Sequence, residues 1–281
     1  MKDYKPFLAI GAVLLIGAAI IAYAINQGGD GPFTKTAPAA TPAGPKPTPF
    51  IAVPPQEHGK LDSKVVVEEF ADYQCPACGI LYSELKKIED DYKGRVKFQY
   101  SNFPITARHP YAMLAARAAE AAAKQGEAEA KQGKAGYQDN DKFWAMHDKL
   151  FAAQNEWGFI DKADKPTKTE AEAREYFAGY AKEIGLNVEQ FKKDLDAPET
   201  DKRIVSDQKR AQLMGVSGTP TIFMSGPQFP APQMLKPEIM AQPNGAGIRQ
   251  AIEYLLGNPP SAAAVATPAG KVAATPAKNG K

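Results

Sequence analysis

The sequence predicts an α/β fold with a helical insertion between its core strands. A β-branched run at 64–70 leads into a helix that begins at Pro76, and an alternating strand follows at 96–100. Strand, helix and strand in this order form a βαβ unit with two parallel strands. The pattern is then helical from about 110 to 214, and the sheet resumes with a strand at 220–224.

The first strand is expected at the centre of the sheet. Residues 64–70 are apolar on both alternating faces, which is typical of a strand that helices cover on both sides. The helix after it begins at Pro76, which suits a first helical turn, and Gly94 supplies its C-terminal stop. Its apolar residues recur at spacings of four, three and four: Leu81, Leu85, Ile88 and Tyr92.

Helix ends within the insertion carry capping residues. Thr169 and Glu172 form a predicted capping box at the start of one helix, and Gly185 ends it. Asn187 is expected to cap the next helix. After the sheet resumes, residues 248–256 supply a final helix.

The chain of 281 residues contains one folded domain between segments of simple composition. Residues 31–58 are a Pro-rich linker and residues 258–281 an Ala-, Pro- and Lys-rich tail, both with too few large apolar groups to fold. Residues 59–257 remain, enough for one domain to bury a sizeable core without cross-links. Lys and Arg number 34 against 32 Asp and Glu, without a dense basic block in the folded part, so nucleic acid is not expected as a partner.

Residues 1–30 are predicted to be a membrane anchor or a signal peptide. Nineteen residues without a charge run from 7 to 25, after Lys2 and Lys5. This length favours a retained anchor, whereas small residues at 22–24 suit cleavage. The lysines that precede the segment place the folded domain outside the cytoplasm. Both interpretations predict an extracytoplasmic protein on the periplasmic or cell-surface side, and the first anchors it to the cytoplasmic membrane.

Cys75 and Cys78 are the only cysteines, so their possible roles can be compared directly. A bridge between residues three apart closes a very short loop and stabilises little, which disfavours a structural role. A zinc site needs four ligands, and His58, His109 and His147 are scattered along the chain, so no metal is predicted. A module that holds a soft metal such as copper(I) on the two thiolates stays open as an alternative.

A redox role for these cysteines has a physical mechanism. Cys75 stands at a helix N-terminus, where the dipole and the free N–H groups favour its thiolate. It would attack as the nucleophile, and Cys78, one turn on and less exposed, would resolve the mixed disulfide. The redox-active Cys75–Cys78 disulfide would serve without any other cofactor. Ala77 adds no cation to stabilise the thiolate, which leaves the oxidising strength of the pair open.

A resemblance to a known family rests on four stretches in a fixed order. They are VVVEEFADYQCPAC at 65–78, SNFPI followed by HPYAMLAARAAEAA at 101–122, KFWAMHDKLFAAQ at 142–154, and GVSGTPTIF at 215–223. From about residue 60 to 256 the sequence resembles the DsbA-like (BdbD/DsbA-type) branch of the thioredoxin superfamily. The resemblance implies a thioredoxin fold with a helical insertion between the second and third core strands.

The resemblance also implies roles for residues outside the cysteine motif. Pro220 would be a cis-proline beside the redox pair, and Thr219 before it would offer backbone hydrogen bonds to an extended substrate. Glu69, six residues before Cys75, would be the buried acid that assists proton transfer at Cys78. Loop contacts or helix packing are expected for three further residues in the matching stretches: His109, Trp144 and His147.

The family resemblance predicts a thiol-disulfide oxidoreductase that forms disulfide bonds in exported proteins. Its partners would be exported proteins with free cysteines and a membrane redox partner that reoxidises it. An isomerase or reductase of the same fold is the alternative, because Thr219 before the implied cis-proline is also compatible with those roles. Pro-Ala between the cysteines, where the best-known oxidases have Pro-His, leaves the strength of oxidation open. A Lys-, Glu- and Gly-rich stretch at 124–141 also departs from the family pattern, and no role is predicted for it.

Overall fold

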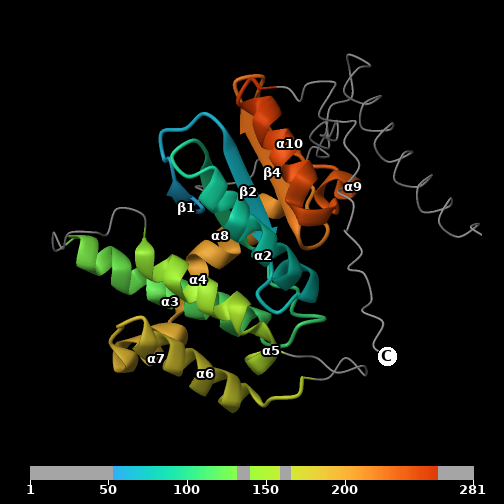
Figure 1. Cartoon of the computed structure of the whole chain (residues 1–281). Helices are drawn as coiled ribbons and strands as arrows, with labels where there is room; N and C mark the ends of the chain where they lie inside the picture. The colour runs from blue at the N-terminus through green and yellow to red at the C-terminus, as the bar shows by residue number, and fades with distance from the viewer. Residues whose placement is uncertain (1–52, 132–139, 159–165, 259–281) are drawn as a thin grey trace, which may run out of the picture.

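The computed structural model describes residues 53–131, 140–158 and 166–258 (Figure 1). The predicted N-terminal membrane segment, most of the linker, the C-terminal tail and part of the 124–141 stretch lie outside these residues. Among the described residues, no helix is long and apolar enough to span a membrane.

Five strands form one mixed sheet in the order β1-β3-β2-β4-β5. They are β1 Gln56–Gly59, β2 Val66–Ala71, β3 Lys97–Asn102, β4 Thr221–Gly226 and β5 Phe229–Met234. The central strand β2 runs parallel to β3 and antiparallel to β4. The predicted βαβ unit and the central position of its first strand are therefore confirmed.

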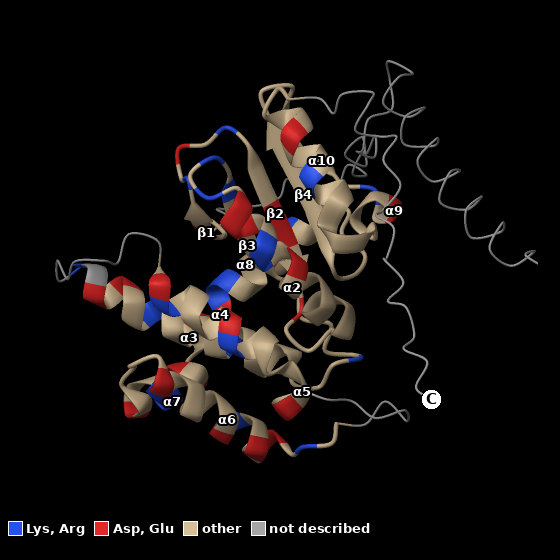
Figure 2. Cartoon of the chain, in the orientation of Figure 1, with Lys and Arg blue, Asp and Glu red and all other residues tan. Residues whose placement is uncertain are grey.

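The insertion consists of the helices between β3 and β4, as predicted. Its helices are α3 Ala112–Lys131, α4 Asp141–Ala152, α5 Gln154–Trp157, α6 Glu170–Glu183, α7 Val188–Leu195 and α8 Asp201–Leu213, with a 3₁₀ turn at Pro198–Thr200. Outside the insertion lie α2 Pro76–Asp91, α9 Pro237–Met240 and α10 Ala246–Leu255, with a 3₁₀ turn at Pro243–Gly245. In Figure 1, α3, α4, α6 and α7 lie together at one end of the sheet. Figure 2 shows acidic and basic residues interspersed on these helices.

Two hydrophobic clusters cover the sheet, and a third fills the insertion. On one face, α2, α9 and α10 pack on β2 through residues such as Val67, Ile88 and Ile252. On the other face, α8 packs Ala211 against Phe70 and Phe223. The third cluster lies mainly among the inserted helices. It contains both cysteines and large buried rings such as those of Trp157, Phe177 and Phe191. The cysteines thus sit where the sheet and the insertion meet.

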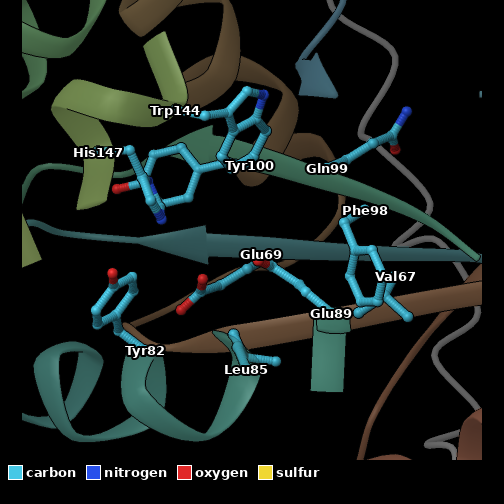
Figure 3. Close-up of a pocket in the computed structure, with 10 residues that line it drawn as sticks. All are labelled: Val67, Glu69, Tyr82, Leu85, Glu89, Phe98, Gln99, Tyr100, Trp144 and His147. Carbon is cyan, nitrogen blue, oxygen red and sulfur yellow. The ribbon is translucent and has the colours of Figure 1, made fainter. Parts of the chain in front are cut away.

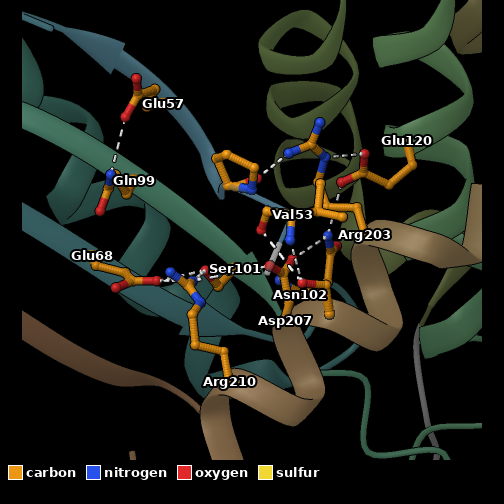
Figure 4. A network of polar contacts seen from close by, with 12 residues as sticks. Val53, Glu57, Glu68, Gln99, Ser101, Asn102, Glu120, Arg203, Asp207 and Arg210 are labelled. Carbon is orange, nitrogen blue, oxygen red and sulfur yellow. Dashed lines mark hydrogen bonds and ion pairs between the residues drawn. The ribbon is translucent and has the colours of Figure 1, made fainter. Parts of the chain in front are cut away.

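A buried polar network also holds α8 against the sheet (Figure 4). The Asp207 carboxylate accepts hydrogen bonds from the backbone N–H (2.9 Å) and side-chain amide (3.2 Å) of Asn102. The same amide donates to Glu120, which also pairs with Arg203 (3.1 Å). Burial raises the pKa of Asp207 to about 8, and the nearby Glu120 adds to that rise. Hydrogen bonds and an ion pair thus join polar groups of β3, α3 and α8 inside the protein, while Asn102 Oδ1 and Asp207 Oδ1 have no hydrogen-bond partner among the described residues.

The helix caps predicted from sequence are confirmed. Glu172 N–H donates to Thr169 Oγ1 (3.2 Å), and the Glu172 carboxylate accepts from Thr169 N–H (2.8 Å), which completes the capping box. Asn187 Oδ1 accepts from Gln190 N–H (2.9 Å) at the start of α7. Gly185 has a positive φ of +74° at the end of α6, a conformation that favours glycine.

The structure corrects the predicted end of the linker at residue 58 and adds two strands. Gln56–Gly59 form β1 and pair with β3, so the folded domain begins before residue 59. This four-residue strand lacks a β-branched residue and has no signal of its own. Strand β5 contains Pro230 and Pro232, which cannot donate to a ladder, and it was missed for that reason. Both strands lie at sheet edges, where such sequences are tolerated.

Gly247 in α10 and Gly179 in α6 give a matched pair of stability predictions. A Cβ on Gly247 would stand 2.1 Å from the Ile239 carbonyl oxygen, whereas a Cβ on Gly179 would meet nothing within 4 Å. Gly247→Ala is expected to destabilise the fold by about 2 kcal/mol or more through overpacking. Gly179→Ala should stabilise it by about 0.5–1 kcal/mol. Urea unfolding measures both, and equal effects would contradict the packing argument.

Candidate active site

The loop between β2 and α2 places Cys75 at the start of a helix. The Asp72 carboxylate accepts from Gln74 N–H (2.8 Å), and the Asp72 carbonyl accepts from Cys75 N–H (3.0 Å), which closes a tight turn. Cys75 takes the N-cap position with extended backbone, and Pro76 takes the first helical position. The next N–H groups of α2 are therefore free to face the Cys75 sulfur.

Cys75 lies in surroundings that favour its thiolate. In its protonated form the Cys75 thiol donates to the Thr219 carbonyl oxygen (3.7 Å), and only 7% of the residue is exposed. A hydrogen bond from the Cys78 thiol lowers the pKa of Cys75 to about 5, helped by Thr219 and by the N–H groups of Cys78 and Ala77, against the opposing effect of burial. Cys75 is therefore a thiolate at neutral pH.

Cys78 has the opposite character. It is fully buried, and burial raises its pKa well above the ordinary value, together with the hydrogen bond to Cys75 and the nearby Glu69 carboxylate. Burial also raises the pKa of Glu69 to about 8, with smaller contributions from the charges of Glu89 and Cys75. Cys78 and Glu69 are thus both protonated at pH values where Cys75 is ionised.

Thr219 and Pro220 lie across from the cysteine motif. The Thr219–Pro220 peptide bond is cis, which confirms the cis-proline that the family resemblance implied. The Thr221 hydroxyl donates to the Gly218 carbonyl (2.8 Å) and fixes the turn before β4. The Thr219 carbonyl is directed at the Cys75 sulfur, so an extended chain bound along Thr219 would reach this sulfur. The substrate-binding role of Thr219 and Pro220 stays a prediction.

Three residues that the sequence did not single out as site residues support this site. The Gln154 side-chain amide donates to the carbonyls of Tyr73 (2.7 Å) and Cys75 (2.9 Å), so α5 holds the start of α2. Asp72 Oδ2 lies 2.7 Å from His109 Nδ1, and this contact raises the pKa of His109. Sequence showed Gln154 and His109 only as members of the family-like stretches, and their partners are distant along the chain.

Glu69 faces a small cavity between the sheet and α2, with α4 beside it (Figure 3). Its volume is about 20 Å³, enough for one water molecule. It is lined by Val67, Glu69, Tyr82, Leu85, Glu89, Phe98, Gln99, Tyr100, Trp144 and His147. His147 is buried among aromatic rings and contacts the Tyr73 hydroxyl through Nδ1 (3.1 Å). Its packing role is as predicted, although the cavity places it near Glu69.

The fold and the site match a known family. The family model described as thioredoxin matches residues 54–237. The probable disulfide bond formation protein D of Bacillus anthracis is 30% identical over 176 residues, which cover 61% of this chain and 70% of that protein. The chain is a DsbA-like member of the thioredoxin superfamily.

Solved structures agree with this DsbA-like assignment. BdbD from Bacillus subtilis, in its oxidised form, is 26% identical with a TM-score of 0.52, covering 74% of this chain and 98% of that one. DsbA2 from Pseudomonas aeruginosa has the same fold at 21% identity and a TM-score of 0.50, over 74% of this chain and 97% of that one. The predicted thioredoxin fold with its helical insertion is therefore confirmed.

Some relatives are much longer than this DsbA-like chain. The Na⁺/H⁺ antiporter NhaA 3 of Salinispora tropica is 34% identical over 181 residues, which are 64% of this chain. The matching part spans only 23% of the antiporter. The domain thus also occurs as a segment of larger proteins.

Glu69 of this DsbA-like domain should make stability depend on pH. Its pKa of about 8 in the fold lies above the unfolded value of about 4.3, so its stabilising contribution is complete below pH 4.3 and is lost as pH rises to 8. Glu69→Gln removes this loss. The difference in free energy of unfolding between the variant and wild type should therefore shift in favour of the variant by on the order of 2 kcal/mol from pH 4.5 to pH 8.5. Urea unfolding of the reduced proteins checks this, and a pH-independent difference would contradict it.

Proposed function

We propose that the protein is an extracytoplasmic thiol-disulfide oxidase that introduces disulfide bonds into exported proteins through Cys75 and Cys78. The observation that carries this proposal is the contrast between the two thiols. The pKa of Cys75 is lowered to about 5, while burial raises that of Cys78. A stabilised thiolate favours the reduced form of the pair, so the disulfide form is a strong oxidant.

The reaction proceeds in two exchanges. A substrate thiolate attacks the Cys75 sulfur of the Cys75–Cys78 disulfide, forms a mixed disulfide, and releases Cys78 as a thiolate. Glu69 donates its proton to Cys78, which burial keeps protonated. A second substrate thiolate then attacks the substrate sulfur of the mixed disulfide. The substrate leaves with a new disulfide, and Cys75 leaves as a thiolate.

The cellular setting that we propose is inferred from the sequence of residues 1–30, a membrane anchor or a signal peptide. Residues 7–25 would hold the domain outside the cytoplasm, where exported proteins with free cysteines are its substrates. The reduced enzyme would be reoxidised by a membrane redox partner. No cofactor other than the Cys75–Cys78 disulfide takes part in this scheme.

The reduction potential of the Cys75–Cys78 pair tests the proposed direction. Equilibration with glutathione redox buffers should give a value between about −120 and −180 mV, in the range of DsbA and protein disulfide isomerase. Thiolate absorbance of the reduced protein should titrate with a midpoint near pH 5, because of the lowered pKa of Cys75. A potential near that of thioredoxin, about −270 mV, would point to a reductase instead.

Activity assays separate the oxidase from the isomerase. The oxidised protein should convert a reduced dithiol peptide to its disulfide stoichiometrically. Repair of a protein with mispaired disulfides by the reduced form, at a rate above that of peptide oxidation, would favour the isomerase.

A further inference from the structure

Glu69 has a free oxygen deep in the protein. Its Oε1 atom is buried and accepts no hydrogen bond from any described residue. The neighbouring cavity of about 20 Å³ is large enough for one water molecule, and Glu69 lines it. A buried polar atom without a protein partner beside a water-sized space is a site where ordered water is expected.

The same cavity reaches a second carboxylate near the surface. Glu89 lines it from the last turns of α2 and keeps about 17% of its side chain exposed. Glu89 Oε1 lies 3.3 Å from His58 Nε2 of β1, and Glu89 Oε2 lies 3.7 Å from Lys86 Nζ. His58 is itself partly exposed and packs on the Trp144 ring, with the ring centroids 4.0 Å apart. Glu89 therefore connects the cavity to solvent.

The groups that face the two carboxylates come from several elements. Around Glu69 they are Cys75 at the N-cap of α2, Cys78 and Tyr82 of α2, Tyr100 of β3 and His147 of α4. Around Glu89 they are Lys86 of α2, His58 of β1 and Trp144 of α4. His147 is buried and burial lowers its pKa well below the ordinary value, so it is neutral. The two tyrosines are also neutral, because burial raises their pKa values. Among the residues that line the cavity, Glu69 and Glu89 are therefore the two carboxylates that a water molecule there could link.

We propose that a water molecule in this cavity links Glu69 to Glu89, and that Glu89, held by His58, exchanges protons between Glu69 and solvent in each catalytic cycle. This inference rests on the proposed function. Glu89 is a positioning residue in this scheme, because it acts on Cys78 only through Glu69. The sequence placed His58 in the linker, whereas the structure places it in β1 beside Glu89.

Reoxidation shows how the proton moves. The Cys75 thiolate attacks an oxidant disulfide such as glutathione disulfide, forms a mixed disulfide and releases one glutathione thiolate. Glu69, protonated at neutral pH, first passes its proton through the water to Glu89 and on to solvent. The ionised Glu69 then takes the proton of Cys78, whose thiolate attacks the Cys75 sulfur and releases the second glutathione thiolate. Glu69 is thus protonated again at the end of the step, and one proton has left to solvent. All electrons gained by glutathione come from the two cysteine thiols.

The test measures resolution of the Cys75–glutathione mixed disulfide by Cys78 between pH 5 and 9, with acid quenching and mass spectrometry. Glu89→Gln is expected to slow resolution at pH 7 about tenfold or more, because general acid–base steps contribute at least this much. Its rate should also rise with pH at a lower midpoint than in wild type, because a negative charge near Glu69 is gone. In a Glu69→Gln background, Glu89→Gln should change neither rate nor midpoint.

Two matched variants exclude a structural explanation. Lys86→Met removes an ion pair of Glu89 but keeps its carboxylate, and it should resolve at the wild-type rate. Glu84→Gln alters a carboxylate of α2 that pairs with Lys87 and is absent from the cavity lining, and it should also behave as wild type. Glu89→Ala should recover at least half of its lost rate in acetate, since a small acid can replace the missing carboxylate.

The proton path would be overturned if Glu89→Gln slowed resolution equally in the wild-type and in the Glu69→Gln background. It would also be overturned if Glu89→Gln kept the pH profile of wild type. These failures are distinct from failure of the proposed function. If the proposed function failed, the wild-type protein itself would form no disulfide in a dithiol peptide, and neither would any variant at position 89.

Discussion

Replacement of Cys75 by serine is expected to reduce peptide dithiol oxidation by at least 10³-fold. Cys75 is the ionised sulfur at the start of α2, and Cys78 is too buried and too weakly acidic to replace it. Cys78→Ser should fail differently. Its Cys75 thiolate can still attack a substrate disulfide, but no second thiol resolves the product, so a mixed disulfide accumulates. Mass spectrometry after exposure to glutathione disulfide distinguishes the two variants.

Circular dichroism of both serine variants provides the folding control. Both thiols are free in the structure, and neither variant removes a bond on which the fold depends. If Cys75→Ser retained dithiol oxidation, or if Cys78→Ser accumulated no mixed disulfide, the assignment of the attacking and resolving sulfurs would be wrong.

The parts of the site that the sequence predicted are those with local signals. The strand before Cys75 and the helix after it are determined by residues that are close together in the sequence. The same is true of the caps at Thr169 and Asn187. The cis bond before Pro220 was supplied by the resemblance, because no local pattern distinguishes it from an ordinary strand start. Local patterns therefore predicted the strand and helix around Cys75, whereas the family resemblance predicted the cis-proline that lies across from it.

Contacts between distant segments could not be predicted. Gln154 reaches the Cys75 carbonyl from 79 residues away, and His58 meets Glu89 through a strand that has no sequence signal. Alternation along β2 showed only that Glu68 and Glu69 point to opposite faces. Burial on both faces was expected of this central strand, but the pattern could not show the surroundings of the two carboxylates, since Arg210 from α8 supplies the partner of Glu68 while Glu69 is left beside a cavity.

Arg210→Met should destabilise the fold by about 2–4 kcal/mol, because it leaves a buried carboxylate without its cation. Arg210 contacts Glu68 and the Ser101 hydroxyl between α8 and the sheet, and Ser101 donates to Glu68 at 2.7 Å (Figure 4). Burial already raises the pKa of Glu68, and Arg210 is the chief group that opposes this rise. Without Arg210, Glu68 must take up a proton or remain as an unpaired buried charge.

An exposed ion pair provides the matched control for this effect. Arg174 pairs with Glu170 at 2.9 Å, but 59% of the Glu170 side chain is exposed, so Arg174→Met should cost less than about 1 kcal/mol. The double variant Glu68→Gln, Arg210→Met removes both charges and should recover part of the loss of the single variant. Urea unfolding at pH 7 measures all three. Equal losses for Arg210→Met and Arg174→Met would mean that burial of Glu68 carries no energetic penalty, contrary to the position of this carboxylate beneath α8.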